Sequence, residues 1–353
     1  MKFFNTGRSK TTRFLTSITR KSTQMLAGLA LATASHHSVA APVDRTLCIY
    51  DIVGANGDIY NMAQDYQVAM MKEGVNFTLK PYTDDRVAAV DFKSGQCDAV
   101  ILPGVTARQF NPFTGSLEAV GAMPEEEHLK MTFRTLSTPK AQPLLVHQGY
   151  EIAGIIPGGT AYLFVNDRTV DTVEELSGKR IAIIEHDPAQ PELVNIAGGS
   201  MVPASVTNFA SLFNNGSVDI CAAPTAAYGA LELYKGLEPN GGIVDVPLGQ
   251  ITFQLVTHQA KFDPEFLQAS REYTFSQFSR ATALIQKAHA DVDPKYWISI
   301  PEADQVKYQE LARQARISIR DKGILEPKAL TVMRKVRCSV DPALAECTAP
   351  DRE

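Results

Sequence analysis

Several features that mark other classes of protein are missing from this 353-residue chain. It has no C-x-x-C pair, which argues against a redox-active dithiol or a zinc-cysteine cluster. It has neither an H-E-x-x-H motif nor a serine nucleophile elbow, so neither a zinc protease nor a serine hydrolase is indicated. It also lacks a low-complexity tract and a basic stripe, which argues against a disordered chain and against a nucleic-acid partner.

Long apolar runs are missing as well, and the first forty residues differ from the rest. They contain six Lys or Arg and no acidic residue, then the run MLAGLALATA, then the small residues of HHSVAAP. This order predicts a secretory signal peptide over residues 1–40, cleaved after Ala40 or Ala41. A membrane anchor is the alternative, but the run is far shorter than the ~20 residues of a span. The remaining chain has 28 basic and 39 acidic residues, a net charge of −11.

Cysteine is scarce, with five in the chain. Export to the periplasm would permit disulfides. Cys338 and Cys347 flank a short proline-containing loop and are the first expected pair. Cys48 and Cys97 are the second, because each begins an apolar run that could be one of two neighbouring parallel strands. Cys221 is then left single, and we expect it to be buried.

The chain contains one spacing twice, F-x-x-G-x-x-D-x-x-x-x-P, at residues 92–103 and 213–224. We interpret each copy as the end of a helix followed by a strand. The Phe packs the last helical turn on the sheet, the Gly ends the helix, and the Asp enters the strand. The Pro ends the strand at its carboxyl end, where ligands of open α/β sheets bind. The alternative is chance, since any α/β protein contains such segments.

Hydrophobic periodicity predicts alternating strands and helices, in the same order around both copies. The β-α-β-α-β order of the first half implies a parallel sheet. The predicted strands are 46–54, 75–82, 97–102, 159–167, 179–185, 217–224 and 251–258. The predicted helices are 58–74, 86–95, 172–178, 205–216, 225–236 with Thr225 as N-cap, one long helix over 264–289, and 302–323 and 326–337.

Four segments in this order resemble the periplasmic solute-binding proteins of tripartite ATP-independent (TRAP) transporters. They are RVAAVDFKSGQCDAVIL, TVEELSGKRIAI, SVTNFASLFNNGSVDICAAPTAAYGALELYKG, and the strand and helix from Ile251 onward. The likeness covers residues 45–325. It implies an α/β type II periplasmic binding-protein fold, with two lobes around a ligand cleft, crossing hinge strands and C-terminal helices.

The resemblance also implies a division of the chain. Lobe I would take residues 44–158 with about 251–300, and lobe II residues 159–250. Residues 301–353 would be the C-terminal helices with a disulfide loop.

The family usually presents an arginine to its ligand's carboxylate, in a K-I-R order just after an L-x-G turn. Here the segment reads Lys179, Arg180, Ile181, Ala182, so the expected arginine position is Ala182. Arg180 would point to the other side of a strand. A second arginine that members often carry corresponds to Ala161. These departures argue against the usual organic-acid ligand.

Ligand-binding residues are expected in loops at the carboxyl ends of strands, with one tyrosine on the hinge side. The candidates are Asn56, Asp58, Thr106, Arg108, Tyr162, Glu185, His186, Pro224, Thr225 and Tyr228. Arg108 is the candidate for an anion, because it could offer a bidentate guanidinium fork. If Arg108 is only a surface arginine, the ligand could be neutral.

These features predict a periplasmic receptor that captures a small solute and delivers it to membrane transporter subunits. It would not be an enzyme and would need no cofactor, metal or nucleic acid. Three alternatives stay open. One is a ligand sensor that is not coupled to transport. Another is an enzyme on the same fold with His186 or Asp58 as base, and the last is a protein that has lost its ligand site.

Overall fold

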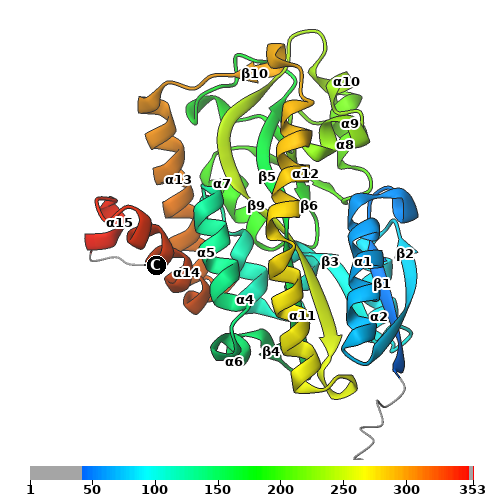
Figure 1. Ribbon diagram of the computed structural model, residues 1–353. Helices are drawn as coiled ribbons and strands as arrows, with labels where there is room; N and C mark the ends of the chain where they lie inside the picture. Colours follow the sequence, from blue (N-terminus) through cyan, green and yellow to red (C-terminus); the bar gives the residue numbers. More distant parts are fainter. Residues whose placement is uncertain (1–41, 350–352) are drawn as a thin grey trace, which may run out of the picture. The chain divides into compact units, whose positions relative to one another are not determined.

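One ten-stranded sheet runs through the part of the chain that the computed structural model describes, residues 42–349 and Glu353 (Figure 1). The strands are β1 (Val43–Tyr50), β2 (Val75–Tyr82), β3 (Ala99–Pro103), β4 (Val146–His147), β5 (Tyr150–Val165), β6 (Arg180–Ile184), β7 (Ser200–Ala204), β8 (Ile220–Pro224), β9 (Gly242–His258) and β10 (Trp297–Ile298). Their order is β2-β1-β3-β9-β5-β8-β6-β7, with β10 beside β9 and β4 beside β5.

The long strands β5 and β9 pair antiparallel with each other and belong to both halves of the sheet. In one half, β3 pairs with the carboxyl end of β9 and runs parallel to β1, which is parallel to β2. In the other half, β8 pairs with the carboxyl end of β5 and runs parallel to β6, which is parallel to β7. The predicted two α/β lobes joined by crossing strands are therefore confirmed. We call the halves lobe I and lobe II.

Strand β5 is longer than predicted, since it begins at Tyr150 instead of residue 159. Its middle contains Pro157, Gly158 and Gly159, which normally interrupt a strand. Here the pairing with β9 shifts register at this point, and Gly159 takes a φ of 112°, so the segment crosses between the lobes without a full ladder.

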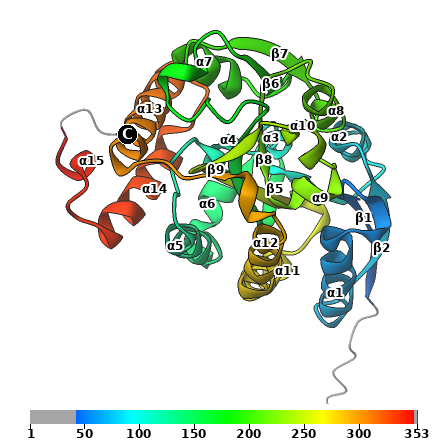
Figure 2. The ribbon, with the colours of Figure 1, turned by 90° about the horizontal axis from the view of Figure 1, so that it is seen from above.

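The helices cover both faces of the sheet (Figure 2). They are α1 (Asp58–Lys72), α2 (Asp85–Lys93), α3 (Gly104–Ala107), α4 (Pro112–Gly115), α5 (Glu126–Leu136), α6 (Gln142–Leu145), α7 (Ala189–Ile196), α8 (Phe209–Asn214), α9 (Ala226–Ala230), α10 (Tyr234–Leu237), α11 (Pro264–Ser276), α12 (Phe278–Ala290), α13 (Glu302–Asp321), α14 (Pro327–Val340) and α15 (Ala345–Thr348). Within the described residues, no helix is long and apolar enough to cross a membrane.

The predicted long helix over 264–289 is wrong in one respect, because it is broken at Gln277 between α11 and α12. The hydroxyl of Thr274 donates to the carbonyls of Ser270 and Arg271, and the hydroxyl of Ser276 donates to the backbone carbonyl of Tyr273. Such side-chain bonds compete with the helical ladder and bend helices. The two helices still follow one another along β5 (Figure 1).

The repeated spacing marks two equivalent units, as interpreted from the sequence. The equivalent pairs are Phe92 and Phe213, Gly95 and Gly216, Asp98 and Asp219, and Pro103 and Pro224. Both Phe side chains are fully buried, and both Gly residues have positive φ. The Asp98 carboxylate accepts the Thr46 N–H in the middle of β1, and the Asp219 carboxylate accepts the Arg180 N–H at the start of β6. Each Asp therefore ties its strand to the first strand of its lobe.

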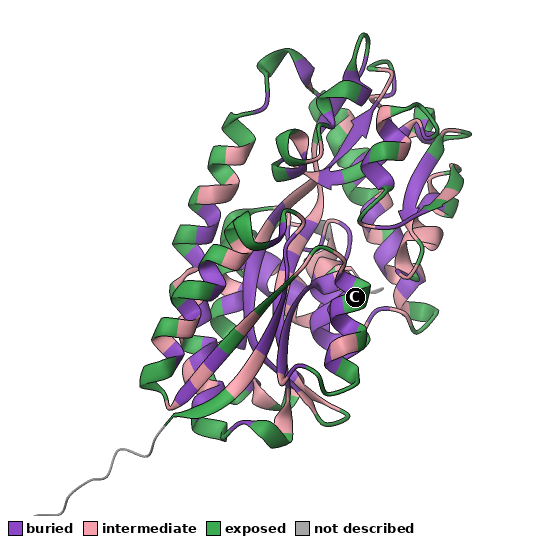
Figure 3. Ribbon diagram, turned by 90° about the vertical axis from the view of Figure 1, so that its right-hand side faces the viewer, coloured by how far each residue is buried: buried purple, intermediate pink, exposed green. Residues whose placement is uncertain are grey.

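The inner strands of the sheet are largely buried on both faces, so they are mostly apolar on both sides, whereas the edge strands β2 and β7 carry exposed residues (Figure 3). In β1, Leu47 and Ile49 enter one core cluster, while Cys48 and Tyr50 enter another on the opposite face. Helices keep their exposed residues on the outside (Figure 3).

The two predicted disulfides are present. Cys48 in β1 is bonded to Cys97, just before β3, and Cys338 in α14 is bonded to Cys347 in α15. Cys221 is free and buried in β8, as expected. The predicted signal peptide over residues 1–40 lies outside the described residues.

Candidate functional site

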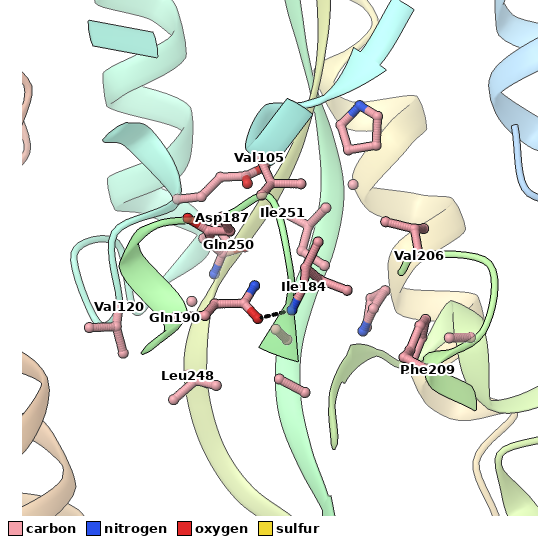
Figure 4. Close-up of a pocket in the computed structure, with 18 of the residues that line it drawn as sticks. Val105, Val120, Ile184, Asp187, Gln190, Val206, Phe209, Leu248, Gln250 and Ile251 are labelled. Atoms are coloured by element: carbon pink, nitrogen blue, oxygen red, sulfur yellow. Dashed lines mark hydrogen bonds between the residues drawn. The ribbon is translucent and has the colours of Figure 1, made fainter. Parts of the chain in front are cut away.

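A cavity of about 500 Å³ lies where the carboxyl ends of the strands of both lobes meet (Figure 4). Its wall comes from the loops after the lobe I strands, from strands β6 and β8, from the crossing strands, and from residues of helices that include α1, α7, α8, α12 and α13. Most of the lining is apolar. Representative lining residues are Val105 and Val120 of lobe I, Ile184, Val206 and Phe209 of lobe II, and Leu248 and Ile251 of β9.

Polar side chains are few in this wall, and most of them already make hydrogen bonds within the protein. The Gln190 Oε1 atom accepts the Ile184 N–H at 2.7 Å, which leaves its amide nitrogen on the cavity side (Figure 4). The Gln250 Nε2 atom donates to the Met123 carbonyl at 3.0 Å. These bonds hold both amides in fixed orientations.

Arg108 and Asp187 form an ion pair across the lobes. The Arg108 Nη2 atom lies 3.8 Å from the Asp187 Oδ1 atom, and both side chains are nearly buried. The Arg108 Nη1 atom donates weakly to the Ile324 carbonyl at 3.4 Å. Its Nε atom is buried without a hydrogen-bond partner among the described residues.

Glu118 lies beside this pair and accepts the Thr252 N–H at 2.6 Å and its hydroxyl at 2.9 Å. Burial raises the pKa of Glu118 to about 7, although the bonds from Thr252 and the charge of Arg108 oppose the shift. The carboxyl group therefore changes charge near neutral pH.

This raised pKa predicts a pH-dependent stability. In the unfolded chain Glu118 loses its proton near its ordinary pKa of 4.5, while the folded protein holds it to about 7. The free energy of unfolding should therefore fall as the pH rises from about 5 to about 7, by at most about 3 kcal/mol, and not change further above that. Glu118→Gln should remove this fall. Urea unfolding of both proteins at pH 5, 6, 7 and 8 measures the free energy of unfolding. If it changes with pH in the same way in both proteins, the prediction is contradicted.

The loop after β6 closes onto lobe I through two further contacts. The Glu185 carboxylate pairs with the Arg86 guanidinium at 2.7 Å. The His186 Nε2 atom lies 3.0 Å from the Thr106 hydroxyl and 3.6 Å from the Asp85 carboxylate. Thr106 in turn donates to Asp85. Together with the arginine–aspartate pair across the lobes, these contacts hold one side of the cavity shut.

The structure divides the predicted ligand-binding residues into groups. Those that line the cavity are Asp58, Arg108 and Pro224. Those that lie in the contact between the lobes are Thr106, Glu185 and His186.

The other four predicted residues are not among the lining residues. Tyr162 packs inside lobe II, with its ring centroid 5.2 Å from that of Trp297. Tyr228 packs on Tyr234, and Asn56 is exposed in the 3₁₀ turn Gly54–Asn56. Thr225 is the N-cap residue of α9, as predicted, but its side chain makes no capping hydrogen bond. Its backbone is already helical, which does not suit a capping hydroxyl.

Sequence reasoning missed several polar lining residues: Asp51, Glu118, Asp187, Gln190 and Gln250. Asp51 directly follows β1, so its position at a strand end was a usable signal. Nothing in the local sequence around Glu118 or Gln250 indicates a cavity.

The alanines at the two positions where the resemblance implies arginines both line the cavity, Ala161 from β5 and Ala182 from β6. Arg180 is not a lining residue. It is half-exposed and pairs with Asp219 at 2.5 Å, as expected from strand alternation.

Comparisons with known proteins agree with this architecture. The family model "Solute-binding protein AdeT 1/2" matches residues 67–352. The "Probable solute-binding protein AdeT1" of Acinetobacter baumannii is 41% identical over 303 residues, which are 86% of this chain and all of the relative. The "Probable solute-binding protein AdeT2" of the same species is 22% identical over 66% of this chain and 98% of the relative.

Solved structures show the same fold. A TRAP periplasmic solute-binding protein from Ralstonia eutropha with bound (S)-2-acetolactate has a TM-score of 0.67 and 13% identity, over 83% of this chain and 99% of that chain. An open apo TRAP protein from Rhodobacter sphaeroides has a TM-score of 0.67 and 17% identity over the same shares. The chain therefore belongs to the AdeT1/2 family of solute-binding proteins and has the two-lobe type II fold of TRAP periplasmic solute-binding proteins.

Proposed function

We propose that this chain is a periplasmic receptor that encloses one small solute between its lobes and delivers it to a membrane transporter. The observation that carries the proposal is the cavity of about 500 Å³, whose wall comes from both lobes and from the strands that join them. A solute held there contacts both lobes at once, so its binding favours the closed arrangement. The volume of the cavity lies in the range of small-molecule binding sites.

The division of the chain follows the hinge. We propose residues 44–158 with about 251–300 as lobe I and residues 159–250 as lobe II, except that β10 pairs with β9 at Ile243 and Val244 and so lies on the lobe II side. Residues 301–353 would brace them, since Ser318 of α13 and Lys322 just after it both donate hydrogen bonds to Glu192 of lobe II. Export through a signal peptide over residues 1–40 fits the two disulfides.

The proposal assigns the predicted residues two tasks. Asp58, Arg108 and Pro224 would contact the solute. Thr106, Glu185 and His186 would hold the closed state. We propose no catalysis, because His186 is engaged with Thr106 and Asp85 in the lobe contact and is not among the cavity-lining residues.

Native mass spectrometry of the mature protein, purified from its own periplasm, tests this function. We expect a stoichiometric small molecule that denaturation releases and that raises the melting temperature when it is added back. An empty protein that no metabolite library stabilises would contradict the proposal.

A blocking variant gives the matched control. Ala161→Trp places a large ring in the cavity wall and should abolish co-purification of the solute. Ala343→Trp adds the same ring at an exposed position outside the cavity and should retain it. Circular dichroism confirms that both variants fold. Solute retained by a folded Ala161→Trp variant would place the binding site elsewhere.

A further inference from the structure

We infer that the solute of this cavity is a largely apolar molecule whose polar group is neutral or positively charged, and that it is not a carboxylate. The inference rests on the proposed function, since it names the class of ligand for the same site. It is carried by the charge balance of the wall, by the engagement of its one cation, and by the occupation of the nearest helix end.

Negative groups dominate the lining. Among the described residues, the carboxylates that line the cavity are Asp51, Asp58, Glu118 and Asp187, whereas Arg108 is the one lysine or arginine there. A carboxylate entering this wall would lose its hydration and meet like charges. A cation or a neutral group would not meet this repulsion.

The one cation is already neutralised. Arg108 faces the Asp187 carboxylate through Nη2 and the Ile324 carbonyl through Nη1. The 3.8 Å between Nη2 and Asp187 is too long for a hydrogen bond, so Nε–H and Nη2 keep donors, but an incoming carboxylate would have to compete with Asp187 for the same positive charge. Glu118 lies near enough to share the same positive charge.

The N-terminus of α1 is also occupied, by a carboxylate of the protein itself. A helix N-terminus with free N–H groups would be the other place for an anion in lobe I. Here the Asp51 carboxylate fills that place, since its Oδ2 atom accepts the N–H groups of Ile59 and Tyr60 and its Oδ1 atom accepts that of Val53. Asp51 approaches so closely that Gly57 has no room for a Cβ atom.

The rest of the wall suits a hydrocarbon or aromatic body. The two alanines on β5 and β6 put methyl groups into the cavity, and Phe209 and Phe253 add rings. Apolar burial would then supply most of the affinity, while the surrounding carboxylates and the free amide of Gln190 select the polar group.

Three probes with the same chain length separate these classes: decyltrimethylammonium, decan-1-ol and decanoate. Isothermal titration calorimetry at pH 7.5, below the micelle concentrations, measures their binding to the mature protein. We expect the cation and the alcohol to bind at least tenfold more tightly than decanoate.

A charge-inserting variant tests the cause. Ala182→Arg places a guanidinium group in the wall, and Ala182→Met adds a side chain of similar length without the charge. We expect Ala182→Arg to weaken the binding of decyltrimethylammonium at least tenfold and to strengthen the binding of decanoate. Ala182→Met should keep the order of affinities of the unaltered protein. Equal changes in both variants would show that charge does not select the ligand and would overturn the inference.

The outcomes separate this inference from the proposed function. If decanoate binds most tightly to the unaltered protein, or if the co-purified solute is a carboxylate, the inference fails and the receptor function stands. If no probe binds and the purified protein carries no solute, both fail.

Discussion

Glu151→Leu is expected to lower the free energy of unfolding by about 3–5 kcal/mol, because it leaves a guanidinium group buried without its counter-charge. The Glu151 carboxylate lies 2.7 Å from the Arg271 Nη1 atom, and the two side chains are only 3% and 4% exposed. The pair joins β5 to α11 inside lobe I. The other carboxylate oxygen of Glu151 accepts a hydrogen bond from the Gln259 side-chain amide, so the variant also removes this hydrogen bond.

The double variant Glu151→Leu with Arg271→Leu is the matched control. It removes both charges together, so it should be markedly more stable than the single variant even though it changes more atoms. Urea unfolding followed by circular dichroism gives all three free energies. A double variant that is less stable than Glu151→Leu would show that the pair does not account for the loss.

Removing the Cys48–Cys97 disulfide is expected to cost about 4 kcal/mol, the second large effect. The bond closes a loop with a sequence separation of 49 residues, and the chain-entropy model assigns a larger stabilisation to a longer loop. Both cysteines are buried in the core of lobe I. The variant Cys48→Ala with Cys97→Ala tests the effect by urea unfolding under oxidising conditions.

The second disulfide is the control for loop length. Cys338 and Cys347 are separated by 9 residues, for which the same model gives about 3 kcal/mol. Cys338→Ala with Cys347→Ala should therefore cost less than the first pair. A larger loss of unfolding free energy for the C-terminal pair would show that the length of the closed loop does not determine which disulfide stabilises the protein more.

The strands and helices of the two repeated units could be predicted because their signals are local. Residues 92–103 and 213–224 each carry a buried Phe, a helix-ending Gly and an entering Asp, and the structure uses them alike. The disulfide between Cys48 and Cys97 could be predicted because neighbouring parallel strands bring their ends together. The first half of β5 was missed because its Pro and Gly residues violate strand propensity, and pairing with β9 overrides that preference.

The candidate site was accessible from the sequence only in part. Pro224 ends β8, and Asp58 and Arg108 lie beyond the carboxyl ends of β1 and β3, which is where an open α/β sheet collects its ligand contacts. The same rule placed Glu185 and His186 near the cleft, but only the tertiary structure shows that they contact lobe I. No local pattern could show whether a loop residue faces the solute or the opposite lobe.

The sequence by itself indicated the two-lobe α/β fold and the two expected cysteine pairs, and it has alanines at residues 161 and 182, where the resemblance implies arginines. These depend on periodicity, spacing and residue type, which are properties of the chain. The tertiary structure alone decided the charge of the cavity, because Glu118 meets Thr252 at a separation of 134 residues and Arg108 meets Asp187 across the lobes. Electrostatic character depends on which groups folding brings within a few ångströms and removes from water, and sequence distance carries no information about that.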